Sequence, residues 1–132
     1  MALAHYLKAE AWYKGHLFEE DHYIDWCREA RENYRLKYLT LLEAIISGYR
    51  KQENWAKCVK YGQRYVTADP YAEEAYQALM IFHHAMGNLS MITKTYELCR
   101  GRLEKDLDCL ISDETTDLYK QLVLPRQNIH LT

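Results

Sequence analysis

Histidine is the first residue type whose placement could indicate chemistry, because a neutral imidazole is a common metal ligand. The chain has six histidines. His83 and His84 are adjacent, so on a helix their side chains point about 100° apart and do not face one ion. His5, His16 and His22 lack a metal-binding partner three or four positions on, apart from acidic residues. We therefore expect no metal site and no cofactor, and we interpret His83 as an aromatic side chain at the edge of the core.

The cysteines stand at positions 27, 58, 99 and 109, without a C-x-x-C pair or another short metal-binding spacing. A catalytic thiol needs a lowered pKa and a positioned base. Free cysteine otherwise behaves as a small buried hydrophobic residue. The pattern favours reduced thiols that serve as small core residues, as expected of a cytoplasmic protein.

Carboxylates and loops give no catalytic pattern either. Glu19-Glu20 and Glu73-Glu74 are adjacent pairs, so each pair diverges on a helix instead of converging. Acidic residues near helix starts usually complement the helix dipole. No Gly-rich phosphate loop and no G-x-S-x-G sequence is present. We predict that this chain is not an enzyme.

Basic residues form two stripes at helical spacing. They could meet phosphates or an acidic partner, or they are the solvated face of their helices, which is the interpretation we favour because no exposed aromatics are interleaved with them. The net charge of −2, with +5 over residues 31–66 between acidic flanks, predicts only nonspecific DNA binding. The stripes are Arg28, Arg31 and Arg35, and Lys57, Lys60 and Arg64.

Length and composition predict one helical domain. A chain of 132 residues suits a single domain, and 48% hydrophobic residues exclude disorder. Five Gly and two Pro leave few turns, which implies long helices. No signal peptide or transmembrane stretch is apparent, so we expect a cytoplasmic location without membrane contact.

Hydrophobic periodicity and capping residues place the helices. Gly15 is a good stop for the first helix, Asn54 is a plausible N-cap, and Ser112 or Asp113 can cap the last helix. Residues 125–132 are expected to form a frayed tail. The expected helices cover residues 2–14, 24–49, 55–67, 70–86, 89 to about 105, and a short segment after residue 112.

Comparison of the sequence with itself at a spacing of 34 residues gives its most informative signal. Nearly every pair is apolar or aromatic, and the turns at residues 52–54 and 86–88 coincide. The pattern resembles the tetratricopeptide repeat, in which helical hairpins stack because none buries its apolar face alone. The pairs are Leu42/Tyr76, Ile45/Leu79, Ile46/Met80, Tyr49/His83, Trp55/Leu89, Cys58/Ile92 and Tyr65/Cys99.

This resemblance implies an all-α fold of stacked hairpins in a right-handed superhelix, with repeat units at about 39–70 and 71–106 and capping helices at both ends. Residues 1–124 would form one domain. The inner stripes of the first helices would line a concave face, where such repeats bind peptides. The candidate residues of this face are Thr40, Glu43, Ser47, Arg50, Glu74, Gln77, Ile81 and His84.

A second resemblance covers almost the whole chain. Its motifs are residues 12–17 (WYKGHL) followed by Trp26 and Arg31, then residues 69–75 (DPYAEEA), then residues 112–115 (SDET) with Leu118-Tyr119. In this order they resemble the bacterial transcriptional activator domain. That resemblance implies an all-α, tetratricopeptide-like domain of bacterial transcription regulators, usually behind a winged-helix DNA-binding domain. No such domain precedes Trp12, so we expect DNA contact only indirectly, through a separate domain.

Two functional hypotheses follow. The first is a non-enzymatic regulatory domain of a bacterial transcription regulator, which acts through protein–protein contacts or self-association. The second is a general tetratricopeptide adaptor that binds a peptide on its concave face and is unconnected with transcription. A small helical enzyme or metal protein is a third class, and the residue inventory disfavours it.

Overall fold

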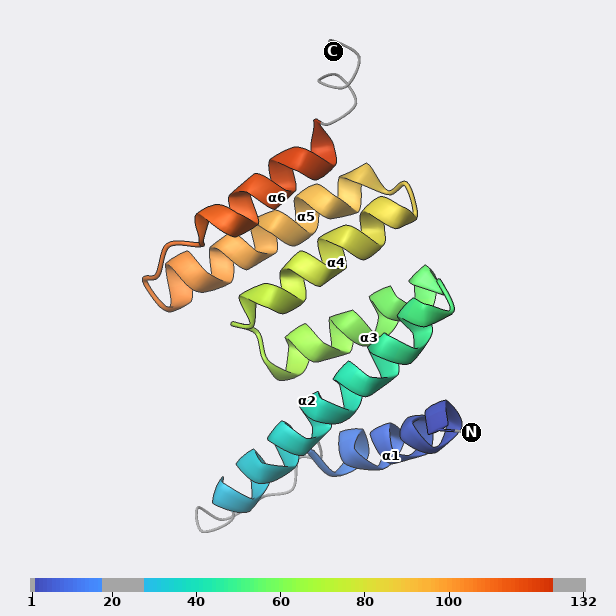
Figure 1. Cartoon of the computed structure of the whole chain (residues 1–132). Coiled ribbons are helices and arrows are strands. Elements are labelled where there is room, and N and C mark those ends of the chain that lie inside the picture. The colour runs from blue at the N-terminus through green and yellow to red at the C-terminus, as the bar shows by residue number, and fades with distance from the viewer. Residues whose placement is uncertain (1, 18–27, 125–132) are drawn as a thin grey trace. The chain divides into compact units, whose positions relative to one another are not determined.

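The computed structural model describes residues 2–17 and 28–124, and over these ranges it is all-α, without a strand. Six α-helices and one short π-helical segment follow each other along the chain (Figure 1). This confirms the predicted fold class of packed helical hairpins. The elements are α1 (Ala2–Leu17), α2 (Arg28–Lys51), α3 (Trp55–Ala68), α4 (Glu73–Ala85), α5 (Leu89–Arg100), the π-helical segment η2 (Gly101–Asp106) and α6 (Asp113–Val123).

The chain divides into two compact units, Met1–Glu53 and Asn54–Thr132. The predicted first repeat, residues 39–70, spans this boundary, and the predicted second repeat, residues 71–106, lies inside the second unit. Each unit is described by itself below. The predicted tail and the motif residue Trp26 lie outside the described residues.

In the first unit, α1 packs against α2. The helices approach closely, since a Cβ on Gly48 would lie 3.3 Å from Cδ1 of Leu3. Their interface also holds a polar contact, because the Tyr38 hydroxyl donates to Oε2 of Glu10 at 2.8 Å and both residues are buried. The buried acid is thus hydrogen-bonded, as a polar group in a protein interior needs to be.

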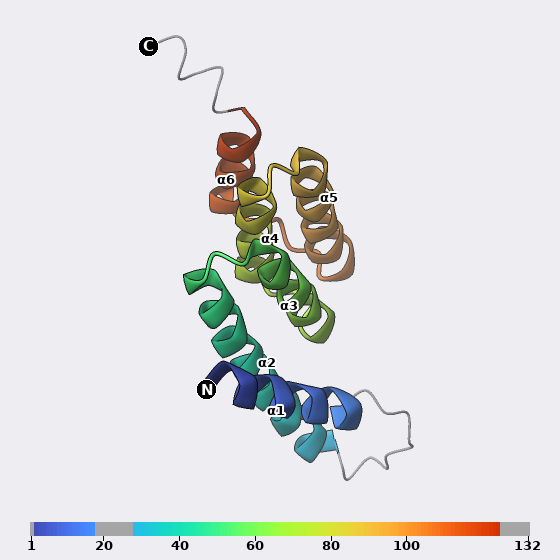
Figure 2. The ribbon, with the colours of Figure 1, turned by 90° about the vertical axis from the view of Figure 1, so that its right-hand side faces the viewer.

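In the second unit, α3, α4 and α5 pack in chain order, and α6 lies against both α4 and α5 (Figures 1 and 2). The helices α3 and α4 approach closely at Gly62, where a Cβ would lie only 2.8 Å from Cδ2 of Leu79. At the far side, the Tyr96 and Tyr119 rings stack with their centroids 4.2 Å apart. The α6 side of the core is formed by Met80, Ile92 and Tyr96 with Ile111, Leu118, Tyr119, Leu122 and Val123.

The two turns of the repeat have the same backbone conformation. Glu53 has φ 55° and Gly87, at a spacing of 34, has φ 72°. The residue after each is an N-cap: the side chains of Asn54 and Asn88 each accept a hydrogen bond from the backbone N–H three residues on, both at 3.3 Å. The backbone bonds before the turn also correspond, since residues 53 and 87 donate to the carbonyls three positions back. The predicted N-cap and the predicted coincidence of the turns are confirmed.

Most of the repeat positions are also core positions, but Ile46, Trp55 and Tyr65 are only half-buried and Leu89 is exposed. Leu42, Ile45 and Cys58 are fully buried in the first copy, and their counterparts Tyr76, Leu79 and Ile92 are at most 3% exposed. Leu89 differs from its counterpart Trp55: Leu89 is 54% exposed, whereas the Trp55 ring stacks on Phe82 of the next helix at 6.0 Å.

Three predicted helix boundaries are wrong. Gly15 does not end α1, which continues to Leu17; its φ is not left-handed, and an interior glycine costs a helix only about 1 kcal/mol. Pro70 lies in a turn, and α4 begins at Glu73. After Arg100 the chain continues as a π-helix and not as an α-helix. The cap of the last helix is confirmed at Ser112, whose side chain accepts from the Thr115 N–H.

A buried tyrosine explains why Pro70 stays outside α4. The Tyr76 hydroxyl donates to the Pro70 carbonyl at 2.7 Å and accepts from Nη1 of Arg102 at 2.6 Å. The same Nη1 reaches the Val66 carbonyl at 3.3 Å. Burial raises the pKa of Tyr76, with the Arg102 cation acting in the opposite direction. Arg102 lies on η2, so the π-helical segment joins the end of α3, the turn after it and α4.

The strained turn predicts a stabilising substitution. Glu53 occupies the left-handed region that costs a residue with a side chain about 1 kcal/mol and costs glycine little. We expect Glu53→Gly to raise the free energy of unfolding by up to about 1 kcal/mol, measured by chemical denaturation. Gly87→Ala is the reciprocal variant, and it should lower the stability by a similar amount. Loss of stability in Glu53→Gly would contradict the equivalence of the two turns.

Candidate partner-binding face

The first half of the predicted face lies on α2 in the first unit. Thr40, Glu43, Ser47 and Arg50 are all exposed, in line with their assignment to one stripe of this helix. The Thr40 hydroxyl donates to the Leu36 carbonyl at 3.1 Å, which is an ordinary contact inside a helix. Glu43 and Arg50 take part in further interactions, so neither is a free charge.

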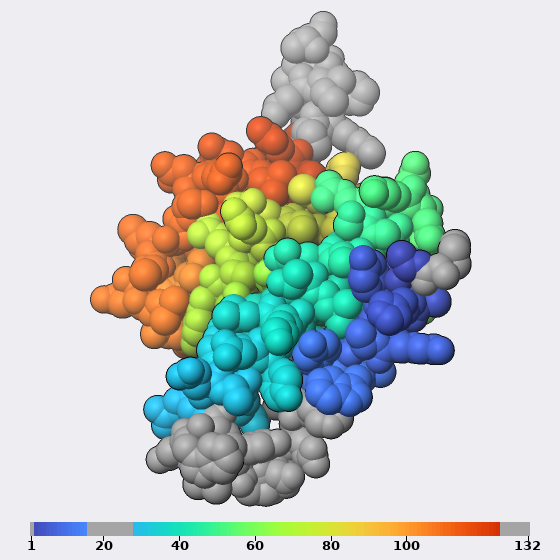
Figure 3. Space-filling view, turned by 60° about the horizontal axis from the view of Figure 1, so that its bottom comes forward, coloured from blue at the N-terminus to red at the C-terminus, as the bar shows by residue number. Residues whose placement is uncertain are grey.

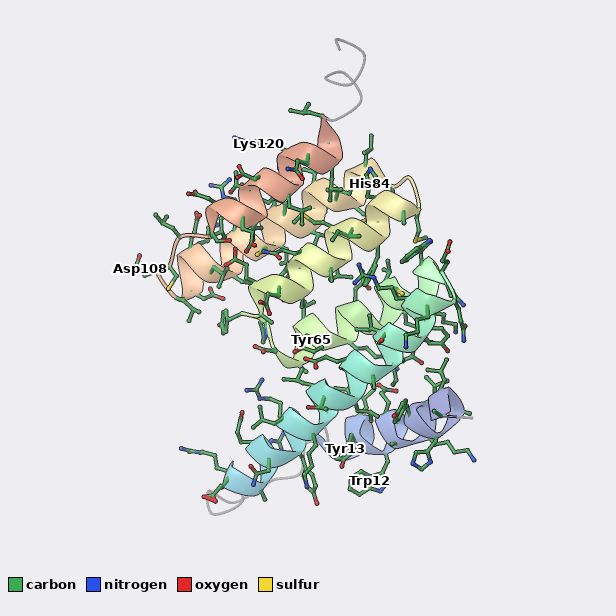
Figure 4. All side chains as sticks on the ribbon, in the orientation of Figure 1. Trp12, Tyr13, Tyr65, His84, Asp108 and Lys120 are labelled. Carbon is green, nitrogen blue, oxygen red and sulfur yellow. The ribbon has the colours of Figure 1, made fainter. Side chains whose placement is uncertain are left out.

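The second half lies on α4 in the second unit. Glu74 and His84 are exposed and Ile81 is half-buried, and Figure 4 shows His84 near the C-terminal end of this helix. Gln77 instead turns toward α6, where its Nε2 donates to Oγ1 of Thr115 at 2.8 Å. Each half is thus a helix stripe within its own unit, and the union of the two halves into one concave face stays a prediction.

Sequence reasoning missed a continuation of this stripe on α6. Because α6 begins 40 residues after α4, the counterparts of the α4 stripe lie 40 positions further on. All four are exposed, and Leu124 is 49% exposed. The continuation is acidic at the start of the helix and apolar at its end. Its residues are Glu114, Asp117, Gln121 and Leu124.

A carboxylate on α4 holds α6 beside it. Oε2 of Glu73 accepts from the Ser112 backbone N–H at 2.9 Å, from the Ser112 hydroxyl at 2.6 Å and from the Thr115 hydroxyl. Ser112 is the N-cap of α6, and Glu73 is the first residue of α4. The side chain at the start of one helix is therefore hydrogen-bonded to the capping residue of the other. Thr115 is fully buried, and Gln77 donates to its hydroxyl from the same side. We call Glu73, Gln77, Ser112 and Thr115 the α4–α6 polar cluster.

The hydrogen bonds of this cluster favour the charged form of Glu73. Partial burial of the carboxyl acts to raise its pKa, but the hydrogen bonds from Ser112 and Thr115 lower it, and the net pKa lies below its ordinary value of 4.5. A carboxylate whose pKa is lowered by folding stabilises the fold above its ordinary pKa. That contribution is lost as the pH falls below 4.5 and the group takes up a proton.

Glu73 and its neighbour Glu74 form a matched pair for testing this contact. We expect Glu73→Gln to lower the free energy of unfolding at neutral pH by about 1–2 kcal/mol, because three donors lose a charged acceptor that is partly screened by solvent. Glu74→Gln, on the exposed side of the same turn, should change it by less than about 0.5 kcal/mol. Chemical denaturation at neutral pH and below pH 4.5 measures both; equal effects would contradict the assigned role of Glu73.

His83 is buried and unpartnered within the described part of the chain. It is 3% exposed, and neither Nδ1 nor Nε2 has a hydrogen-bond partner there. This agrees with its interpretation as a core aromatic at the repeat position of Tyr49. Burial lowers its pKa below the ordinary value of 6.5, because the charged imidazolium is poorly solvated in the core. The unfolded chain therefore takes up a proton at a higher pH than the folded chain does.

The lowered pKa predicts an acid-induced loss of stability. As the pH falls below 6.5, protonation of unfolded His83 is favoured and the free energy of unfolding decreases. We expect His83→Phe to remove this component, whereas His84→Phe, at the exposed neighbouring position, retains it. Thermal melts at about pH 7.5 and about pH 5.5 measure the difference. The same slope in His83→Phe and wild type would show that another group is responsible.

The cysteines only partly match their predicted role. Cys58 and Cys99 are fully buried, and burial raises the pKa of Cys99 to about 12, so its thiol stays protonated. Cys109 is exposed, which corrects its assignment to the core. It lies in the loop between η2 and α6. Cys27 lies outside the described residues.

The basic stripes make contacts within their own helices. On α3, the Lys60 and Arg64 cations lie 5.6 Å and 4.8 Å from the centre of the Tyr61 ring. On α2, Nη2 of Arg35 lies 2.6 Å from Oε2 of Glu32. These contacts favour the interpretation of both stripes as solvated helix faces. Within residues 2–17 and 28–124, no group of three or more His, Cys, Asp or Glu side chains is placed to hold a metal ion, and no helix is long and apolar enough to cross a membrane.

The paired helices and the 34-residue turn geometry define a helical-repeat protein. Comparison with family models then gives the family. Residues 1–123 match the bacterial transcriptional activator domain, and the chain belongs to that family, as its motifs suggested. Domains of this family are regulatory parts of bacterial transcription regulators. No curated protein and no solved structure matched the chain.

Proposed function

We propose that this chain is a non-enzymatic protein-interaction domain of a bacterial transcription regulator, located in the cytoplasm. It acts through contacts with another protein or through self-association. It reaches DNA only through a separate DNA-binding domain. Family membership over residues 1–123 is the observation that carries the proposal.

The exposed stripe of α4 and its continuation on α6 support a surface for protein contact. Glu74, Glu114 and Asp117 give it an acidic part, and the half-buried Ile81 and exposed Leu124 give it an apolar part. The α4–α6 polar cluster and the packing of Met80 against α6 fix the two helices side by side. A surface that is already ordered loses little conformational entropy when it binds.

The alternative from sequence is a peptide adaptor unconnected with transcription. It would use the same stripes, Thr40 to Arg50 and Glu74 to His84, because exposed residues of the first helices line the inner face of such repeats. Family membership favours the first proposal. The two differ in one result: only the first predicts that the chain changes transcription when it is attached to a promoter.

A reporter assay tests this difference. The chain is fused to an unrelated DNA-binding module whose site lies upstream of a bacterial promoter. We expect reporter expression several-fold above that of the module alone, and we expect Glu74→Lys to lower it by at least half, because the substitution reverses a charge on the stripe. Glu97→Lys is the control, because it makes the same charge change at an exposed position of α5. Thermal melts confirm that both variants are folded.

Sedimentation velocity on the chain alone separates the two routes. A dimer that Glu74→Lys dissociates supports self-association, and a monomer assigns the reporter signal to another protein. A reporter level equal to that of the DNA-binding module alone, in a chain that is monomeric, would contradict the proposed function.

A further inference from the structure

A loop between η2 and α6 exposes acidic and apolar side chains in alternation. Residues 106–110 are Asp-Leu-Asp-Cys-Leu, and all five are exposed. Leu110 is 86% exposed and Leu107 is 44% exposed. Figure 4 shows Asp108 on this connection, and in Figure 3 the orange atoms, which include the loop, lie at one side of the second unit. The stripes of the proposed function lie on α2, α4 and α6, so they do not include this loop.

The conformation of the loop is fixed at its start. The backbone N–H groups of Leu107 and Cys109 both donate to the carbonyl of buried Leu103, at 3.3 Å and 3.0 Å. Asp108, between them, adopts φ 56°, a left-handed conformation that Asp tolerates better than most residues do. These bonds close the end of η2 and direct residues 107–110 away from it.

The loop is also fixed at its end. Ile111 packs against the core, and Ser112 donates to Glu73 of α4 through both its N–H and its hydroxyl. The inward positions on either side of the loop are therefore taken by Leu103 and Ile111. Leu107 and Leu110, between them, are both exposed.

Tyr71 extends the apolar part of this surface. It is 40% exposed, and its hydroxyl donates to Oδ2 of Asp106 at 3.4 Å, which places it beside the loop although it lies 35 positions away. The surface thus combines two leucines and an aromatic ring with two acids. Tyrosine is enriched at binding hot spots, and a polar rim commonly surrounds the apolar core of a protein interface.

We propose that Tyr71 and residues 106–110 form a docking surface for a second protein that presents apolar side chains beside basic ones. The proposal rests on the proposed function, since it names the chemistry of a partner. Charge supports it: over residues 104–114, five acidic side chains stand against Lys105 alone. In a symmetric contact between two copies, Asp106 and Asp108 of one copy would face Asp106 and Asp108 of the other. Electrostatic repulsion between these carboxylates opposes such a contact.

The probe for this test is a synthetic amphipathic helical peptide with leucines on one face and lysines beside them. One comparison peptide replaces each lysine by glutamate, and another replaces each leucine by serine while it keeps the lysines. Binding to the full chain is measured by fluorescence anisotropy at low and high salt. We expect the Leu/Lys peptide to bind more tightly than either comparison peptide, and we expect its affinity to fall with salt because part of it is electrostatic.

Variants locate the binding site. We expect the double variant Leu107→Ser, Leu110→Ser to weaken binding about tenfold, which is the effect of losing an interface anchor. Asp106→Asn with Asp108→Asn should weaken binding several-fold and reduce its salt dependence. Leu98→Ser is the matched control, because Leu98 on α5 has the same 44% exposure as Leu107. All these side chains are exposed, so the thermal melts of these variants should agree with that of wild type.

Four outcomes would overturn the assignment: no preference for the Leu/Lys peptide, retained affinity in the double variant, equal loss in Leu98→Ser, or a self-associated chain that the double variant disperses. The last would make a second copy the occupant. None of them decides the proposed function, because the effect of Glu74→Lys on the reporter is measured without any peptide. A reporter that stays silent while the loop still binds the Leu/Lys peptide would contradict the proposed function alone.

Discussion

The second unit depends on the burial of one hydroxyl group. Tyr76 is fully buried, and a buried hydroxyl without partners costs about 1–3 kcal/mol. Its two partners come from opposite directions in the sequence: the Pro70 carbonyl before α4, and Arg102 after α5. Arg102 reaches this position from η2, the π-helical segment that extends α5. The path of the chain from Val66 to Asp106 is therefore organised around this side chain.

The consequences of this network extend to the last helix. Because η2 and the loop after it separate α5 from α6, α6 begins six residues later than the 34-residue frame requires. The carboxylate of Glu73 then meets the cap of α6, and the stripe of α4 continues on α6 at a spacing of 40. A serine N-cap that is hydrogen-bonded by a neighbouring helix satisfies groups that a helix start otherwise leaves to solvent. Thus η2 and the loop after it, which interrupt the 34-residue repeat, also position α6.

The sequence predicted those features that depend on local chemistry. The fold class, the cap at Asn54 and the cap at Ser112 follow from residues within a few positions of one another. The 34-residue spacing follows from the recurrence of one such local pattern. The buried residues of the repeat, such as Cys58 and Ile92, follow from periodicity for the same reason. The errors at Pro70 and after Arg100 have another origin, because both depend on Tyr76 and Arg102, whose contact is 26 positions apart. No local pattern reports such a contact.

For the candidate face too, the sequence predicted what depends on the helical period and not what depends on contacts between helices. Exposure of the α2 stripe and of Glu74 and His84 follows from the helical period, which places them opposite the core. The turning of Gln77 toward α6 does not, because it needs the position of Thr115. The α6 continuation and the exposed Cys109 were missed because the 34-residue frame ends before them.

Adjacent residues with opposite roles show how this fold makes a surface. Glu73 accepts three hydrogen bonds between helices, whereas Glu74, one residue on, is exposed. Ile111 packs in the core, whereas Leu110 before it is 86% exposed. His83 is buried and His84 is exposed. The two members of each pair have similar side chains, but these point in different directions because the residues are adjacent along the backbone. One member therefore stabilises the fold, and the other lies on the surface. Surface chemistry in this domain can therefore change at the outer position of a pair with little effect on the core, provided that the inner position is kept.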